Sequence, residues 1–370
     1  MKFTVNKADF EKAITPVSII AQSKTAESTL HGIYIEADNG TVTLYCYDIE
    51  KGIKTTVDAF VAGSGNIIAD PQIVQIIHCM PEGEITLSTD DNYIITLNSG
   101  DAVFQIMGKD AKSYPTMPDV KGHTEFALTK KQMKNLITKT IFSACKDDAN
   151  PVLKGSLFEI ADNMLTVSAI DGFRCAVRKE KNSVDSPDLA VSFILPGKAQ
   201  QNILRIMDDS DEEVRIELGA KHLIMITDGL FMMFRLIEGD FPKYEKYIPE
   251  YNTTAIIDRD RFITCLERVA IINDKMKSSA KLHFENDTLR ISCETESGKV
   301  NDVLSVYMEG EPKEILFNQT FLLEALKCCE NEKVELRLAE NGRATVITET
   351  EEDKNDDSSY IYLVMPVRGR

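Results

Sequence analysis

The sequence lacks the long apolar runs and the paired cysteines that mark several large classes of protein. No apolar run approaches the about eighteen residues that a membrane-spanning helix needs. The opening MKFTVNKADF has no apolar core of the kind found in a signal peptide. The eight cysteines are scattered and include no CxxC pair, so we expect reduced, buried thiols in a cytoplasmic protein rather than disulfides.

Motifs for catalysis and metal binding are missing as well. The five histidines are isolated from one another and from other metal ligands, so neither a metal site nor a cofactor is expected. Gly63-Ser64-Gly65 is not followed by either glycine-rich pattern that cradles phosphate, and no GxSxG elbow occurs. These absences favour a protein that works by its shape. An enzyme whose active site is assembled from distant residues stays open as an alternative.

The sequence does contain an internal repeat. A short alternating strand, an amphipathic helix and two or three further strands recur six times, with a period of about sixty residues. The repeats open near Met1, Asn66, Thr124, Ala190, Thr253 and Pro312. Repeats one, three and five resemble each other most, which groups the six into pairs. This pattern predicts an α+β protein of three similar domains, at residues 1–120, 121–250 and 251–370.

Hairpin turns and linkers support this division. Apolar residues alternate on both sides of Asp38-Asn39-Gly40, Asp162-Asn163 and Asn286-Asp287, which is typical of hairpins with one buried face. Segments 108–123 and 238–253 each carry two prolines and charged residues, so we interpret them as stiffened linkers between domains. The helices are expected to lie on one side of the sheets.

The charge is unevenly distributed. A net charge of −17, from 42 basic and 59 acidic residues, argues against a uniformly basic nucleic-acid binder. The predicted helices at 129–146 and 196–207 nevertheless contain basic residues and no acidic ones. This bias predicts that the helical face meets a polyanion while the sheets do not. Ordinary solvated lysines are the alternative for any single helix.

Four motifs, in order along the repeat, resemble the bacterial sliding clamps, the β subunits of the DNA polymerase III holoenzyme. They are MKFTV at 1–5, DGFR at 171–174, EGDFPKY at 238–244 and VMPVR at 364–368. The resemblance covers the whole chain. It implies a head-to-tail homodimeric ring of six domains whose helices line a hole around duplex DNA. It also implies a non-catalytic processivity factor that binds the replicative polymerase, the clamp loader and repair proteins through short peptides.

The resemblance assigns a hydrophobic peptide cleft between the second and third domains. The matching positions are Leu153, Ile170, Gly172, Phe173, Arg174, Pro242, Tyr247, Phe321, Val346, Leu363, Val364, Met365, Pro366 and Val367. A soft, methionine-containing groove suits varied peptides, roughly Gln-Leu-x-Leu-Phe, and Arg174 is expected to hold a peptide carbonyl or carboxylate. The alternative for the C-terminal segment is an ordinary core strand, and alternation allows one face to be buried while the other lines the cleft.

Ring closure and the DNA path are also assigned by the resemblance. Phe104 and Ile106, on an edge strand, are expected to face Ile271 and Ile272 of the other subunit, with ordinary core packing as the alternative. The DNA-facing positions are expected to be Lys24, Lys198 and Arg205, with Lys130 and Lys134 added for their charge alone.

Two departures from the family pattern bear on partner preference. Asn150 stands where many members carry arginine, and Phe173 stands where histidine is common. A monomeric, acidic interaction scaffold that keeps the fold without encircling DNA stays open as a second interpretation.

Overall fold

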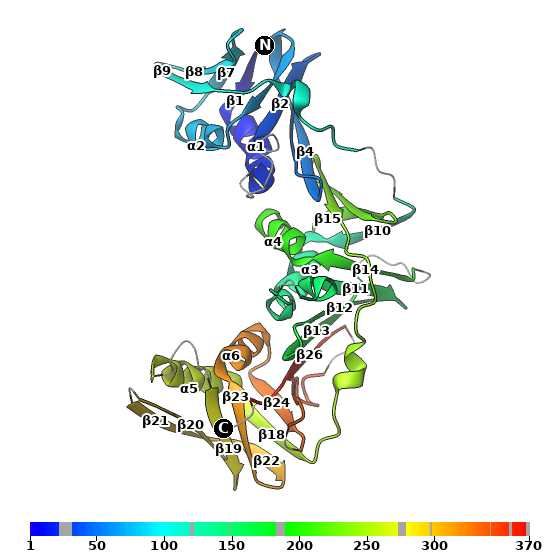
Figure 1. The fold of residues 1–370 in the computed structure, drawn as a ribbon, viewed down its shortest axis with the longest axis vertical. Helices are drawn as coiled ribbons and strands as arrows, with labels where there is room; N and C mark the ends of the chain where they lie inside the picture. Colours follow the sequence, from blue (N-terminus) through cyan, green and yellow to red (C-terminus); the bar gives the residue numbers. More distant parts are fainter. Residues whose placement is uncertain are drawn as a thin grey trace. The chain divides into compact units, whose positions relative to one another are not determined.

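The computed structural model describes residues 1–21, 32–118, 122–147, 149–182, 189–272, 279–296, 298–340, 342–354 and 357–367. The chain divides into two compact units, Met1–Lys131 with Gln201–Leu236, and Gln132–Gln200 with Ile237–Arg370. Each unit combines antiparallel sheets with helices, so the predicted α+β class is confirmed (Figure 1). No helix in the described ranges is long and apolar enough to cross a membrane.

The first unit contains two sheets. The five-stranded sheet has the order β5-β1-β7-β8-β9 and consists of β1 (Lys2–Asn6), β5 (Phe60–Gly63), β7 (Glu84–Thr89), β8 (Ile94–Ser99) and β9 (Ala102–Met107). The eight-stranded sheet has the order β10-β15-β16-β17-β4-β3-β2-β6. Its strands are β2 (Ile33–Asp38), β3 (Thr41–Tyr47), β4 (Lys51–Asp58), β6 (Gly65–Ala69), β10 (Thr124–Thr129), β15 (Glu213–Leu218), β16 (His222–Thr227) and β17 (Leu230–Arg235). Pairing of β17 with β4 makes this sheet continuous between repeats distant in sequence.

The second unit also contains two sheets. The nine-stranded sheet has the order β14-β11-β12-β13-β26-β25-β24-β18-β22. Its strands are β11 (Gly155–Ala161), β12 (Met164–Ile170), β13 (Arg174–Lys181), β14 (Val191–Pro196), β18 (Thr253–Asp258), β22 (Tyr307–Gly310), β24 (Lys333–Leu338), β25 (Thr345–Thr348) and β26 (Ser358–Val364). The four-stranded sheet has the order β21-β20-β19-β23 and consists of β19 (Ser279–Glu285), β20 (Thr288–Thr295), β21 (Gly298–Ser305) and β23 (Lys313–Asn318).

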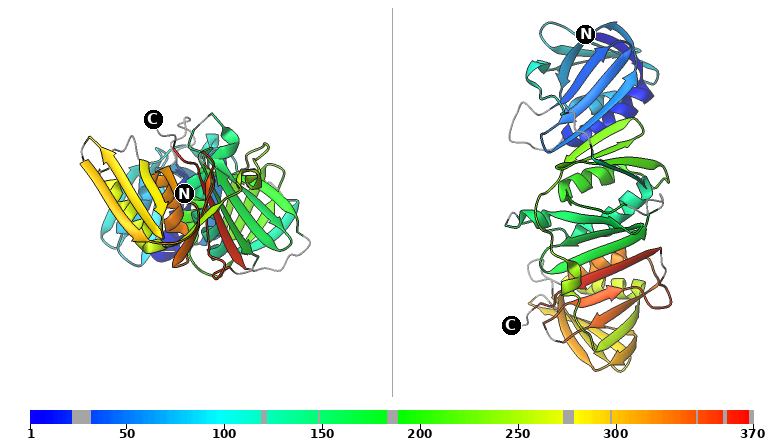
Figure 2. Two further views of the ribbon diagram at one scale, coloured as in Figure 1. Left: turned by 90° about the horizontal axis from the view of Figure 1, so that it is seen from below. Right: turned by 90° about the vertical axis from the view of Figure 1, so that its right-hand side faces the viewer.

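Six α-helices occur in the described ranges together with these strands. They are α1 (Lys7–Ala21), α2 (Gln72–Cys79), α3 (Lys130–Thr138), α4 (Gly197–Ile206), α5 (Arg259–Ile272) and α6 (Gln319–Cys328). The apolar positions of α5 recur at helical spacing, since Phe262, Leu266 and Val269 are all fully buried. Helix α5 contacts β20, β21 and α6, and α1 likewise contacts β3, β4 and α2 (Figures 1 and 2). Each core is therefore built from paired helices against sheet.

The three predicted hairpin turns are confirmed. Asn39 and Gly40 have φ angles of 48° and 82°, and the two turn residues in the Asp162-Asn163 and Asn286-Asp287 hairpins also have positive φ. Strand partners pair directly across each two-residue loop. Such loops need positive φ at both central residues, which asparagine, aspartate and glycine adopt at low cost. The local sequence therefore sets the register of these strands.

One predicted helix is shorter than expected. The helix predicted at 129–146 ends at Thr138 and is followed by a separate 3₁₀ turn, Ile141–Ser143. The Thr140 hydroxyl donates to the carbonyl of Leu136 at 2.7 Å, a local bond that competes with continued helix. Helix α5 is described as far as Ile272, and residues 273–278 lie outside the described part of the chain.

Candidate functional site

One apolar cluster in the second unit gathers residues from several distant segments. Its members are Leu153, Ile170, Cys175, Val177, Tyr244, Ala344, Val346 and Leu363, each at most 8% exposed. Four of them, Leu153, Ile170, Val346 and Leu363, were assigned to the predicted cleft. Because these four come from chain positions up to 210 residues apart, the fold and not local sequence brings them together.

Strand pairing explains the convergence. Leu363 of β26 lies opposite Cys175 of β13 and opposite Val346 of β25, so all three side chains share one face of the sheet. Beyond the strand, the Met365 amide donates to the Phe173 carbonyl at 2.8 Å. The C-terminal segment therefore runs beside the turn at 171–173.

That turn is held by Asp171. Its carboxylate accepts the amide hydrogens of Phe173 and Arg174 at 2.9 and 3.0 Å. Gly172, between Asp171 and Phe173, has a φ of 90°, a backbone conformation that residues other than glycine rarely adopt. The turn thus depends on the DGFR motif itself, and it leaves Phe173 65% exposed.

Exposed apolar side chains occur on segments that also supply members of the buried cluster or continue from them. We call Phe173, Tyr247, Met365 and Val367 the C-terminal apolar surface; they are 65%, 52%, 37% and 41% exposed. Pro366 forms an isolated β-bridge with Phe317, and the Val367 amide donates to the Leu316 carbonyl at 2.8 Å. These contacts hold residues 365–367 in place beyond the end of β26. Grouped exposed apolar side chains of this kind mark interaction sites.

Arg174 is engaged in bonds within the chain that the sequence does not reveal. It is 7% exposed, and its Nε donates to Asp171 at 2.9 Å. Its terminal nitrogens donate to Glu324 and to the Phe142 carbonyl, and its guanidinium lies 4.2 Å from the centre of the Phe321 ring. Three of its five N–H groups are therefore used within the chain, where they position the turn. The expected bond from Arg174 to a bound peptide stays a prediction.

Other predicted cleft residues have different neighbours. Val364, 1% exposed, belongs to the large core around α5 and α6, and Phe321 packs against that same core. Pro242 is half-buried, next to Phe241, which packs on the apolar cluster. Leu363 and Val364 alternate into two different clusters, but both are buried, so neither of these two positions leaves an open face on the strand.

Cys175 and Tyr244 also belong to the cluster and were not assigned from the sequence. Burial raises the pKa of the Cys175 thiol to about 12, with a further contribution from the nearby Asp171 and Glu245 carboxylates. The thiol is therefore protonated at neutral pH and packs as a small apolar group. A sequence signal did exist for Tyr244, which closes the EGDFPKY motif, and for Cys175, which follows DGFR directly.

Two of the residues predicted for the dimer interface, Phe104 and Ile106, lie on an edge strand of a sheet. Strand β9 pairs only with β8 in the described ranges, so the predicted edge position of Phe104 and Ile106 is confirmed. Val103 and Met107 on the same strand are 60% and 66% exposed and were missed. In the second unit β21 is likewise an edge strand.

The isoleucines at the end of α5 lie near the start of that edge. Ile271 is 83% exposed. A Cβ placed on Gly298, the first residue of β21, would lie 3.7 Å from the Ile272 side chain, so Ile272 packs beside this end of the strand. Both isoleucines are therefore at a boundary of the unit and not in its core.

The prediction that Lys130 faces DNA is wrong. Lys130 is 3% exposed, and its ammonium group contacts the carboxylates of Glu212, Asp228 and Asp208. Burial by itself would lower its pKa, but the hydrogen bonds to Asp228 and Glu212 outweigh burial and raise it. Lys130 is therefore a buried cation paired with the loops around β15 and β16 of its own unit.

The other predicted cations divide into three groups. Lys198 and Arg205 of α4 are exposed, and Lys134 of α3 is half-buried. Lys24 lies outside the described residues. Within those residues, no three histidine, cysteine or acidic side chains group as a metal site would require.

Comparison with known sequences decides the family. Models of the N-terminal, central and C-terminal domains of the DNA polymerase III beta subunit match residues 1–118, 127–243 and 246–368. The chain belongs to the DNA polymerase III beta subunit family, the beta sliding clamps. Members of this family are non-catalytic processivity factors of DNA polymerase III.

Full-length relatives agree with this assignment. The beta sliding clamps of Halalkalibacterium halodurans and Staphylococcus epidermidis are each 28% identical over all of this chain and over 100% and 99% of their own. Among solved structures, a putative DNA polymerase III beta subunit from Eubacterium rectale is 27% identical, with a TM-score of 0.92 and full coverage of both chains. The Bacillus subtilis DNA polymerase sliding clamp is 25% identical, with the same TM-score and coverage. The three domains expected from the repeat and the sliding clamp fold implied by the resemblance are thus confirmed.

Proposed function

We propose that two copies of this clamp-family chain close into a head-to-tail ring around duplex DNA in the cytoplasm. The ring tethers the replicative polymerase, and in turn the clamp loader and repair proteins, through short peptides. The proposed domains are residues 1–120, 121–250 and 251–370. The observation that carries the peptide-binding part is the exposed C-terminal apolar surface beside a buried apolar cluster.

Exposed apolar residues at two edge strands support the proposed ring. Strand β9 exposes Val103, Phe104 and Met107, and the region around β21 exposes Ile271 and Val303. An exposed apolar edge strand invites pairing with another chain, and a heterologous contact that closes after two copies gives a ring. We therefore propose that Phe104 and Ile106 of one copy face Ile271 and Ile272 of the other.

The DNA path requires cations but few tight contacts. Lys198 and Arg205 are exposed on α4, and we propose that they face DNA together with Lys24 and Lys134. Contacts with phosphates alone carry no sequence information, and a small number of them allows sliding. The acidic remainder of the chain limits non-specific adsorption of DNA elsewhere.

Peptide docking on the C-terminal apolar surface is tested with a fluorescent Gln-Leu-x-Leu-Phe peptide. Met365→Ala removes an exposed, flexible side chain from this surface and is expected to weaken binding about tenfold. Fluorescence polarisation measures the change. Met107→Ala, a truncation of an even more exposed methionine on β9, is the matched control and is expected to bind as the wild type does.

The two possible failures have different meanings. Equal weakening by both alanine variants would contradict the assignment of the site to the C-terminal apolar surface. Absence of binding to the wild-type chain would mean that this surface takes peptides of another sequence. Asn150 and Phe173, which differ from the residues common in the family, would then be the first positions to examine for an altered peptide preference.

A further inference from the structure

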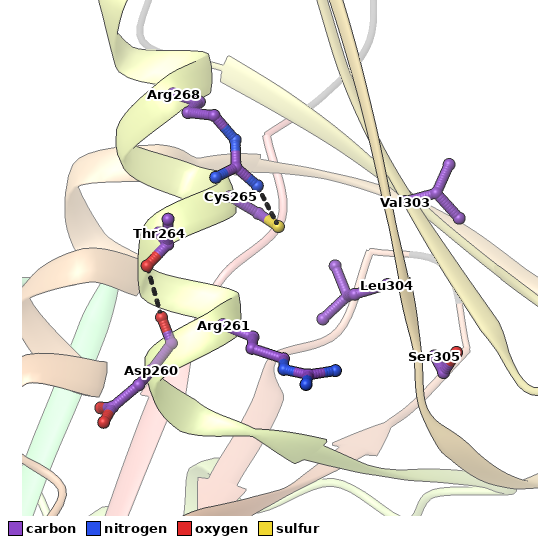
Figure 3. Close-up of a pocket in the computed structure, with 8 residues that line it drawn as sticks. All are labelled: Asp260, Arg261, Thr264, Cys265, Arg268, Val303, Leu304 and Ser305. Atoms are coloured by element: carbon purple, nitrogen blue, oxygen red, sulfur yellow. Dashed lines mark hydrogen bonds between the residues drawn. The ribbon is translucent and has the colours of Figure 1, made fainter.

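A pocket opens between α5 and the edge strand β21. It has a volume of about 410 Å³ and is lined by Asp260, Arg261, Thr264, Arg268, Leu304 and Ser305 (Figure 3). Two arginines line the pocket, and they are not equivalent. Arg268 donates through Nε to Asp302 at 2.6 Å and through a terminal nitrogen to the Cys265 sulfur at 3.2 Å. Its charge is already balanced within the subunit.

Arg261 has no such balance. In Figure 3 its side chain extends from α5 toward the strand that carries Leu304 and Ser305. Its backbone amide donates to Asp258 at 2.9 Å, but within the described residues its guanidinium has no hydrogen-bond or ion-pair partner. A guanidinium prefers a planar bidentate acceptor, above all a carboxylate. The pocket therefore offers a cationic group at the C-terminal end of an edge strand.

An unpaired carboxylate lies at the start of the other edge strand. Asp101 is exposed in the turn before β9, and within the described residues it too has no partner. Strands in both sheets pair antiparallel with every neighbour, so an antiparallel continuation from β9 to β21 extends the same pattern. Antiparallel pairing sets the start of one strand against the end of the other. It therefore brings Asp101 toward Leu304, Ser305 and Arg261.

The same register satisfies the apolar contacts. When the start of β9 meets the end of β21, the end of β9, with Ile106 and Met107, meets the start of β21. Ile272 packs at that start, beside Gly298. A parallel arrangement would instead place Asp101 against Ile272 and leave the carboxylate in an apolar setting. The antiparallel arrangement of β9 and β21 thus pairs the Asp101 carboxylate with the Arg261 guanidinium and the apolar end of β9 with Ile272.

We propose that this pocket receives the Asp101 carboxylate of a second copy of the chain, which forms an ion pair with Arg261 and fixes the antiparallel register of ring closure. The inference rests on the proposed ring and adds to its interface one ion pair at the end of β21. The pair occurs twice in a two-fold ring, once at each interface.

The test is a charge swap measured by sedimentation of the full-length chain at low salt. Asp101→Arg and Arg261→Asp, made singly, are each expected to raise the dimer dissociation constant about tenfold or more, because each sets like charges face to face. The double variant restores the opposite charges and is expected to return to within about threefold of the wild type. Asp91→Arg, in the exposed turn at the other end of the β8–β9 hairpin, is the matched control for net charge.

Each outcome is decisive. Singles that behave like the Asp91→Arg control, or a double variant as weak as the two singles combined, would overturn the ion pair and leave the dimer standing. A wild-type chain that is monomeric at every concentration would overturn the ring and, with it, this inference.

Discussion

Replacing Ile272 with lysine is expected to convert the ring into monomers. Ile272 packs at the start of edge strand β21, beside Gly298, and the proposed interface covers it with Phe104 and Ile106 of the second copy. Burying an unpaired ammonium group in such an apolar contact costs several kcal/mol. Since each 1.4 kcal/mol corresponds to a factor of ten, the dissociation constant should rise at least about a hundredfold.

Sedimentation across a concentration series measures this change. Ile248→Lys is the matched control, because Ile248 is an exposed isoleucine of the second unit that lies after the 3₁₀ turn Tyr244–Tyr247 and not at α5. The Ile272→Lys monomer should still bind the Gln-Leu-x-Leu-Phe peptide as the wild type does, since the C-terminal apolar surface belongs to a single chain. A dimer of unchanged affinity would contradict the proposed closure and favour the monomeric scaffold.

Removing residues 365–370 is expected to abolish peptide binding while leaving the dimer intact. Met365 and Val367 supply half of the C-terminal apolar surface, whereas β26 ends at Val364 and keeps its pairing with β13 and β25. Losing anchors of a binding surface costs about 2 kcal/mol or more each, so the affinity should fall at least about a hundredfold.

The truncation also removes two backbone hydrogen bonds, from Met365 to Phe173 and from Val367 to Leu316. We expect about 1–3 kcal/mol of lost stability in urea unfolding, which is small enough to keep the chain folded. A shorter truncation of residues 368–370 is the control and should bind peptide within about twofold of the wild type. Retention of full affinity by the longer truncation would show that peptides dock elsewhere.

Where neighbouring residues determine the backbone conformation, the sequence is enough to predict the structure. The hairpins at Asn39-Gly40 and Asn286-Asp287 follow from residues that tolerate positive φ, and the alternating strands on either side follow from burial of one face. The position of Phe104 on an edge strand was likewise predicted correctly from the sequence. Because six repeats carry these signals, the amino-acid pattern is enough to predict the α+β class and the three-domain fold.

Where a side chain depends on distant partners, the sequence is misleading. Lys130 belongs to a helix without acidic residues, yet its three carboxylates come from Asp208, Glu212 and Asp228, at least 78 positions away. The terminal nitrogens of Arg174 likewise donate to Glu324 and to the Phe142 carbonyl, partners that nothing in the local sequence indicates. Local charge counts cannot reveal such pairing, because burial and neighbours across the sheet decide it.

The assignment of the peptide site illustrates both cases. Leu363 and Val364 alternate along one strand, but only the fold decides which of them joins Leu153 and which joins the core around α5. The resemblance to a known family supplied the candidate positions. Strand pairing and exposure then separate the buried cluster from the exposed Phe173 and Met365.

The central claim is that DNA passes through a closed ring, and retention on DNA tests it most directly. The labelled chain is loaded by a clamp loader onto nicked circular DNA, and the bound fraction is measured by gel filtration before and after a single restriction cut. We predict stable retention on the circle and rapid loss after linearisation, because a ring without tight phosphate contacts slides off a free end. Equal retention on both forms would contradict the account, since it would mean that the chain grips DNA without encircling it.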